Sequence, residues 1–237
     1  MIASAGRNAS LSAKLGWATL AITVVALLMA IFYAPTDRVQ GIAQRIYYFH
    51  VPMAIVAYLS FFVVLVASVM YLWTRDMKWD RRARASVELG VVFTTLVLIT
   101  GSIWGKPIWN TWWTWDARLT STLVLWFIYV AYIMLRSYTP DVERGARFGA
   151  VLGIIGFIDV PIVHFSVTWW RTLHPGPVVL QASPAAPPQT TETFLVAMLA
   201  AVLFYIWLMR VRTGLEEARD ENRELEQELA LRGGLYA

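Results

Sequence analysis

The chain contains no cysteine among its 237 residues. This absence excludes disulfide bonds, iron–sulfur clusters, thiolate zinc sites and cysteine nucleophiles. Charge is also scarce, since Asp, Glu, Lys and Arg make up 15% of the chain, against roughly 25% in an average soluble domain. Histidine occurs three times. Any metal or cofactor chemistry must therefore use histidine, methionine, tyrosine or carboxylate side chains.

The chain is rich in apolar residues, and many of them lie in long continuous stretches. Apolar residues account for 58% of the chain, and its mean hydropathy is +0.54. A bilayer core of about 30 Å requires roughly 20 apolar residues of helix. Six stretches meet this requirement, so we expect an all-α polytopic membrane protein with six transmembrane helices. The stretches are residues 17–34, 52–73, 86–104, 118–135, 148–167 and 192–209.

The basic residues predict the orientation of these spans. With six spans, both termini lie on the same side of the membrane. If that side is the cytoplasm, it holds 15 of the 20 Lys and Arg residues, as the positive-inside rule requires. We therefore expect cytoplasmic termini, a membrane domain over residues 1–212, and outer loops at about residues 35–51, 105–117 and 168–191.

Residues 213–237 differ in character from the spans. Three leucines and one alanine share one helical face, and seven acidic residues between positions 216 and 228 cover most of the rest. This pattern predicts a solvated, acidic cytoplasmic helix that ends at Gly233. A docking helix for a cytoplasmic partner and a short coiled coil are the alternatives.

Tryptophan is concentrated in one predicted outer loop. The segment WGKPIWNTWWTWDARLTS, residues 104–121, holds five of the twelve tryptophans. An interfacial aromatic belt, the alternative interpretation, would be spread over both membrane faces. The clustering therefore favours a flat apolar binding surface. Its tryptophans are Trp104, Trp109, Trp112, Trp113 and Trp115.

Two of the three histidines lie on the same predicted side as this loop. His50 stands in YYFHVP at the outer end of the second span, and His174 stands in TLHPG in the third outer loop, whereas His164 lies inside the fifth span. A lone histidine is more often a satisfied polar residue than a ligand. Two histidines beside an aromatic surface predict a haem site, because neutral imidazole is the usual proximal ligand of haem iron.

Charged residues near this face have two kinds of interpretation. Asp116 directly precedes the fourth span and is typical of a helix N-cap. Asp159 lies inside the fifth span, where an ionisable group is functional by default, and a local hydrogen bond beside Pro161 is the alternative. Four basic residues lie within loop reach of two haem propionates. They are Arg45, Lys106, Arg118 and Arg171.

Residues 104–121 resemble the tryptophan-rich WWD signature of haem-handling proteins in bacterial cytochrome c maturation. With its six spans, YYFHVP before the second and PIVHFSVTWWRTLHPG after the fifth, the chain is similar to the cytochrome c maturation protein C family, also called haem exporter protein C. The close resemblance covers roughly residues 35–180. It departs at Asn110, where the WGTWW pattern of the family has glycine.

The resemblance implies a haem site on the outer face. His50 and His174 would be the axial ligands of the iron, and the tryptophans and Asp116 would form the platform for the ring. Haem b would be transient cargo, passed to a periplasmic haem chaperone. The candidate haem contacts are Arg45, Trp104, Trp109, Trp112, Trp113, Trp115, Asp116, Arg118, Trp169, Trp170 and Arg171.

The resemblance also implies partners in the bacterial inner membrane. They would be the ATPase and permease subunits of an ATP-binding cassette complex and a small single-span subunit. The chain has no Walker motif, so ATP hydrolysis would belong to another subunit. We expect binding and transfer rather than enzymatic catalysis, and no nucleic-acid partner.

Three other classes of protein share some of these features. A cofactor-free membrane assembly or permease subunit is the main alternative, with the tryptophan loop as a docking surface. Haem lyases of the resembled system are longer and have more histidines. A cytochrome b-like carrier would need repeated histidine pairs within its spans, where this sequence places only His164.

Overall fold

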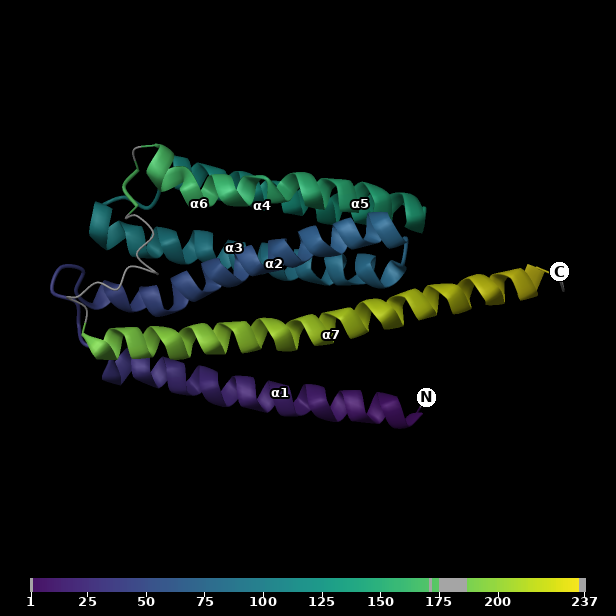
Figure 1. The fold of residues 1–237 in the computed structure, drawn as a ribbon, viewed down its shortest axis with the longest axis horizontal. Helices are drawn as coiled ribbons and strands as arrows, with labels where there is room; N and C mark the ends of the chain where they lie inside the picture. Colours follow the sequence, from purple (N-terminus) through teal and green to yellow (C-terminus); the bar gives the residue numbers. More distant parts are fainter. Residues whose placement is uncertain (1, 171, 175–186, 235–237) are drawn as a thin grey trace.

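The computed structural model describes residues 2–170, 172–174 and 187–234 (Figure 1). Six helical segments in this part of the chain are long and apolar enough to cross a membrane. The described residues contain no β-strand, and their one isolated β-bridge joins Asp37 to Gly41. These findings confirm the all-α class and the six predicted spans.

The helices extend beyond the predicted spans at almost every end. A π-helical turn ends the first span, a 3-10 helix precedes the second, and the fifth is divided at Ile158 into two helices. The elements are α1 (Ile2–Leu28), η1 (Met29–Tyr33), η2 (Ile42–Ile46), α2 (Tyr47–Thr74), α3 (Met77–Trp109), α4 (Ala117–Tyr138), α5 (Val142–Phe157), α6 (Asp159–Trp169) and α7 (Pro188–Gly234).

Short local signals set several helix ends. Asp76, Asp116 and Asp141 each accept a hydrogen bond from a backbone N–H group in the first turn of α3, α4 and α5 respectively. Helix α3 ends at Trp109, and the next residue, Asn110, has a left-handed φ of 57°. Glycine adopts this conformation most readily and asparagine is the usual second choice. Asn110 is therefore compatible with a position where the resembled pattern has glycine.

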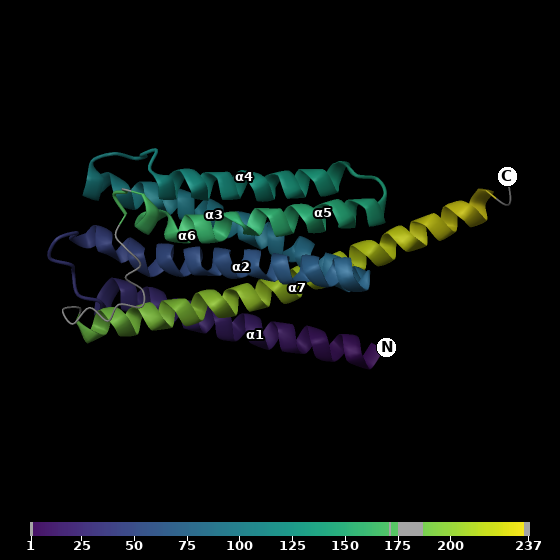
Figure 2. The same ribbon diagram turned by 45° about the horizontal axis from the view of Figure 1, so that its top comes forward.

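Helix α2 lies at the centre of the bundle. It packs against α3, α5 and α7, while α4 packs against α3, α5 and α6. Helix α1 runs along α7 at the edge of the bundle (Figures 1 and 2). The rings of Phe61 and Tyr129 stack with centroids 3.9 Å apart, and both side chains are fully buried. This contact ties α2 to α4 within the main core.

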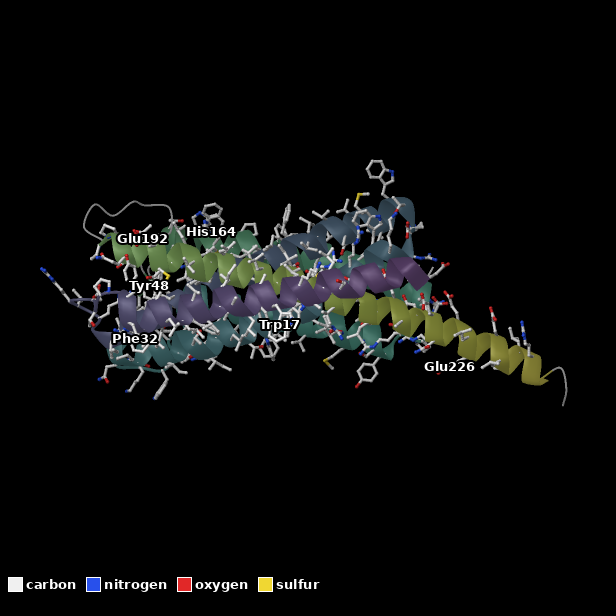
Figure 3. All side chains as sticks on the ribbon, turned by 90° about the horizontal axis from the view of Figure 1, so that it is seen from below. Trp17, Phe32, Tyr48, His164, Glu192 and Glu226 are labelled. Carbon is white, nitrogen blue, oxygen red and sulfur yellow. The ribbon has the colours of Figure 1, made fainter. Side chains whose placement is uncertain are left out.

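The two ends of the bundle differ in chemistry. The histidine end carries η2, the start of α2, the α3–α4 loop and the end of α6. The arginine end carries the α2–α3 and α4–α5 connections, and there α7 continues beyond the bundle toward the C-terminus (Figure 1). Figure 3 shows Tyr48, His164 and Glu192 toward the histidine end and Glu226 on the projecting part of α7.

The acidic segment continues the last span without a break, as the final turns of α7. Most residues of its first turns are exposed, but Glu216 departs from the expected solvated pattern, since it is only 2% exposed. Its carboxylate lies 2.7 Å from a guanidinium nitrogen of Arg84 on α3. Farther along the helix, Leu225 and Leu229 are exposed. At the beginning of the tail, the face that carries Glu216 therefore contacts α3, and most of the other residues are solvated.

Candidate functional site

His50 lies in the first turns of α2, where it packs against α3. Its Nδ1 atom is 2.9 Å from the Thr100 hydroxyl, and its ring makes an edge contact with Trp104, with centroids 5.6 Å apart. A Cβ atom added to Gly101 would lie 3.1 Å from His50 Cε1. Thr100, Gly101 and Trp104 thus form a cradle for the imidazole on one face of α3.

The Thr100 contact determines the tautomer of His50. A threonine hydroxyl has one proton to donate, and Thr100 donates it to the backbone carbonyl of Leu96 at 2.6 Å. Thr100 must then accept the hydrogen bond from His50, so Nδ1 carries the imidazole proton. In the neutral ring, this leaves the lone pair of Nε2 available for a ligand.

His174 is held by Asp116, across the loop between α3 and α4. Its Nδ1 atom lies 3.0 Å from Asp116 Oδ2, which also accepts a hydrogen bond of 2.9 Å from the Thr172 hydroxyl. An ionised carboxylate can only accept, so Nδ1 again carries the proton and Nε2 has the lone pair. The other oxygen, Asp116 Oδ1, caps α4 by accepting from Leu119 N–H at 2.9 Å. This confirms the N-cap prediction for Asp116.

The electrostatics of this pair favour a charged Asp116 and a neutral His174. Burial raises the pKa of Asp116, but hydrogen bonds from Leu119 and Thr172, together with the charge that His174 gains at the low pH where Asp116 titrates, bring this pKa below its usual value. Burial lowers the pKa of His174, and Asp116 offsets only part of that effect. The neutral imidazole is the form that binds a metal ion.

Two of the predicted tryptophans contact the histidines directly. Trp104 and Trp109 lie in the last turns of α3, and the Trp109 ring makes an edge contact with His174, with centroids 4.9 Å apart. His50 also lies within electrostatic range of His174. Helix α3 therefore presents one tryptophan to each histidine. These tryptophans are only five residues apart on α3, so both histidines lie at the same end of the bundle.

The remaining aromatic candidates are more exposed. Trp113 is half-buried and makes an edge contact with Trp115, with centroids 5.6 Å apart. Four tryptophans at this end are more than half exposed, and the structure does not bring them into contact with either histidine. They are Trp112, Trp115, Trp169 and Trp170.

The basic candidates have different settings. Arg118 donates to the backbone carbonyl of His164 at 3.2 Å and lies within electrostatic range of both His50 and His174. Lys106 is engaged with the backbone and side-chain oxygens of Asn110. The predicted contact Arg171 lies outside the described residues. Arg118 is therefore the cation that the structure associates most directly with the two histidines.

Several buried polar atoms at the histidine end have no hydrogen-bond partner among the described residues. An unsatisfied buried polar atom costs about 1–3 kcal/mol, so a group of them favours a site that takes a polar ligand or water. The set includes Arg45 Nε, Trp113 Nε1, Thr114 Oγ1 and Arg118 Nε. Two of these donors are guanidinium nitrogens, which suit carboxylate acceptors such as haem propionates.

The interior residues singled out in the fifth span stand apart from this site. The side chain of His164 is exposed on α6, toward the surface that would face lipid. Asp159 is 9% exposed, and its Oδ2 atom has no partner among the described residues. The predicted local hydrogen bond of Asp159 is thus absent at this oxygen.

Sequence reasoning missed Thr100, Gly101 and Thr172. Thr172 had a local signal, since a Thr two residues before a His can accept from the backbone N–H of that His, as it does at 3.0 Å. Thr100 and Gly101 had none, because they meet His50 only through the packing of α2 on α3. Thr100 and Gly101 lie four and three residues before Trp104, which places all three on the same face of α3.

Comparison with known proteins identifies the family. A family model described as "Heme exporter protein C" matches residues 4–228. The chain belongs to the haem exporter protein C family. The matched region contains both histidines, the tryptophan-rich segment and most of α7.

Named relatives agree with this assignment. "Heme exporter protein C" of Escherichia coli K12 is 39% identical over 221 residues, covering 92% of this chain and 88% of that protein. "Heme exporter protein C" of Bradyrhizobium diazoefficiens is 36% identical over 236 residues, covering 98% and 89%. The "Putative cytochrome c biosynthesis ccmC-like mitochondrial protein" of Marchantia polymorpha is 39% identical over 153 residues, covering 65% and 64%. The similarity thus extends over most of the membrane bundle.

Proposed function

We propose that this protein binds haem at the histidine end and passes it to a periplasmic haem chaperone during cytochrome c maturation. The Nε2 atoms of His50 and His174 would ligate the iron of haem b, which is cargo rather than a resident cofactor. Trp104 and Trp109 would contact the ring, and Arg118 would hold a propionate. The work is binding and transfer, with no enzymatic step assigned to this chain.

One observation carries this proposal. Each of the two histidines has its Nδ1 atom within hydrogen-bond distance of an oxygen, Thr100 Oγ1 at 2.9 Å or Asp116 Oδ2 at 3.0 Å, and we infer that Nδ1 carries the proton and Nε2 is the ligating atom. Metal-bound histidines in proteins are commonly oriented by such a hydrogen bond from the other ring nitrogen. The adjacent tryptophans supply the flat apolar contact that a porphyrin requires.

The two ligands would be unequal. A carboxylate acceptor increases the basicity of an imidazole more than a hydroxyl does, so His174, backed by Asp116, is expected to be the stronger iron ligand. His50 is backed by the neutral Thr100 hydroxyl. We therefore expect the bond from His50 to break first when haem leaves for the chaperone.

The proposal includes a location and partners. The arginine end would face the cytoplasm and the histidine end the periplasm, across the bacterial inner membrane, because most Lys and Arg residues fall at or beyond the arginine end. Family membership supports work beside the ATPase and permease subunits of an ATP-binding cassette complex and a small single-span subunit.

Visible absorption spectra test the ligation. Wild type, His50→Ala, His174→Ala and the control His164→Ala would be purified in detergent from haem-replete cells and recorded oxidised and reduced. Sharp reduced bands of six-coordinate haem are expected in wild type and in the control. They should be degraded in each of the other two variants. Unchanged spectra in both His50→Ala and His174→Ala would refute axial ligation by this pair.

The exposed tryptophans favour a second candidate function. Trp112 and Trp115 are 59% and 76% exposed, and aromatic residues are enriched at protein–protein contacts. A cofactor-free assembly or permease subunit could use them as a docking surface. Purified protein that takes up no haem on titration, yet retains its partner subunits until Trp112 and Trp115 are both replaced by Ala, would establish that function instead.

A further inference from the structure

The arginine end contains a connected network of charged side chains from α3, α4 and α7. Arg84 on α3 is its centre, with nitrogen–oxygen distances of 3.2 Å to Asp80, 2.7 Å to Glu216 and 2.9 Å to Asp220. Arg136 on α4 joins through Asp80 at 2.8 Å. The network joins Arg81, Arg84, Arg136, Arg212, Arg219 and Arg223 to Asp80, Glu88, Glu216 and Asp220.

This network has an excess of positive charge. It contains six guanidinium groups and four carboxylates, so two positive charges are not compensated within it. Its centre is shielded from water, since the side chains of Asp80 and Glu216 are 2% and 3% exposed. Poor solvation strengthens the attraction between this excess charge and any anion that enters.

A cavity of about 450 Å³ borders the network, between α3, α4 and α7. Four arginines line it, Arg84, Arg136, Arg219 and Arg223, together with the carboxylates of Glu88 and Glu216 and apolar side chains that include Ile133. Arg219 and Arg223 are four residues apart on α7, with side chains 52% and 56% exposed. The cavity lining therefore carries four guanidinium groups against two carboxylates, and part of its wall is apolar.

Two residues that line the cavity have a buried polar atom without a partner among the described residues. Tyr132 lines the cavity and is 1% exposed, yet its hydroxyl has no hydrogen-bond partner among the described residues. The Nε atom of Arg136, also on the wall, is unpartnered in the same part of the chain. Arg136 Nε is a donor and the Tyr132 hydroxyl can donate, so an acceptor-rich occupant would suit both.

We propose that this cavity binds a phosphate-bearing anion, with the headgroup of an anionic phospholipid as the favoured source. Phosphate oxygens accept from several guanidinium donors at once. Basic pockets between helices at the membrane surface suit anionic lipid headgroups, and the apolar wall would contact the glycerol and acyl groups. Free inorganic phosphate or a nucleotide has the same oxygen chemistry. The site is independent of the haem proposal, because it lies at the opposite end of the bundle.

Lipid binding to the intact chain tests the site. The protein would be purified in detergent, stripped of lipid and titrated with phosphatidylglycerol or phosphatidylcholine, with binding counted by native mass spectrometry. Phosphatidylglycerol is expected to bind at least tenfold more tightly. The double variant Arg219→Gln/Arg223→Gln should lose about tenfold or more of this affinity, the usual effect of removing charged hydrogen bonds.

Two further variants make the result specific. Arg144→Gln/Arg147→Gln removes two basic residues of α5 at the same end, where Arg147 pairs with Glu143 outside the network, and should bind as wild type. Tyr132→Phe removes only the unpartnered hydroxyl, so it should fold normally and bind more weakly. Competition by inorganic phosphate or ATP, without preference between the two lipids, would support the phosphate site and assign it a soluble source.

Two outcomes would overturn the proposal. One is equal affinity for phosphatidylglycerol and phosphatidylcholine with no competition by phosphate or ATP. The other is an equal loss of binding in the Arg144/Arg147 and Arg219/Arg223 double variants, since this would show general surface charge rather than a defined cavity.

Discussion

The carboxylate of Asp116 joins the start of α4 to His174, with one oxygen for each: Oδ1 accepts from Leu119 N–H at 2.9 Å, and Oδ2 lies 3.0 Å from His174 Nδ1. The N-cap fixes the position of the carboxylate relative to α4. The carboxylate in turn orients a histidine that lies 58 residues farther along the chain. A local helix signal thereby becomes part of the candidate ligand site.

Asp116→Asn separates these two roles, because asparagine is as good an N-cap as aspartate but has no negative charge. We expect the helix to be retained and haem affinity to fall about 10- to 100-fold, as is usual when the partner of a metal-bound histidine is changed. Haem titration followed by Soret absorbance measures the effect. Asp76→Asn, which alters the N-cap of α3 at the arginine end, is the control. Equal affinities of the two variants would count against the role of Asp116.

Thr100→Val should weaken ligation by His50 through loss of the hydrogen-bond acceptor. A neutral hydrogen bond contributes about 0.5–1.5 kcal/mol, so we expect a loss of haem affinity of roughly two- to tenfold, smaller than for Asp116→Asn. Displacement of the His50 bond by added imidazole should also become easier. Thr100→Ser should restore both properties. Thr94→Val removes a similar backbone-bonded hydroxyl on α3 and should change neither; an imidazole response equal to that of Thr100→Val would contradict the assignment.

The sequence was sufficient for the parts of the fold that depend on local pattern. Apolar length identified the six spans, and Asp116 before an apolar helix indicated an N-cap, which the structure confirms. The contact of His50 with Thr100 could not be predicted from the sequence, because it depends on how α2 packs on α3. No spacing within either helix records which faces meet.

The acidic part of α7 is a second case in which the sequence pattern did not predict a contact between helices. Its charge pattern is typical of a solvated helix, yet Glu216 is buried against Arg84. The sequence shows the opposite charges of these two residues and predicts that both lie on the same side of the membrane. The sequence does not predict their contact, since this contact requires α7 to continue straight beyond the membrane span and lie against α3.

Gly101→Ala tests the fit of His50 on α3. A Cβ atom at this position would lie 3.1 Å from His50 Cε1, closer than ordinary van der Waals contact, so the ring must shift by a few tenths of an ångström. We expect weaker haem binding and altered reduced bands in the visible spectrum, with the helix intact. Gly214→Ala is the matched control, because no atom lies within 4 Å of its added Cβ. An altered spectrum in Gly214→Ala, or an unchanged spectrum in Gly101→Ala, would contradict the prediction that the packing of His50 against Gly101 controls haem ligation.

Acidification should release haem, and the two pKa shifts at the site set the range. Burial lowers the pKa of His174 below the usual 6.5, and Arg118 adds to this effect, so the ligating neutral form persists from alkaline pH down to below 6.5. The pKa of Asp116 is also below its usual value, so this group stays charged throughout that range. Soret absorbance should therefore be constant between about pH 8 and 6.5 and fall only at lower pH, as protons compete with iron for His174. Iron ligation lowers the midpoint further. A release midpoint above pH 6.5 would contradict both the assigned shift and the role of His174 as the controlling ligand.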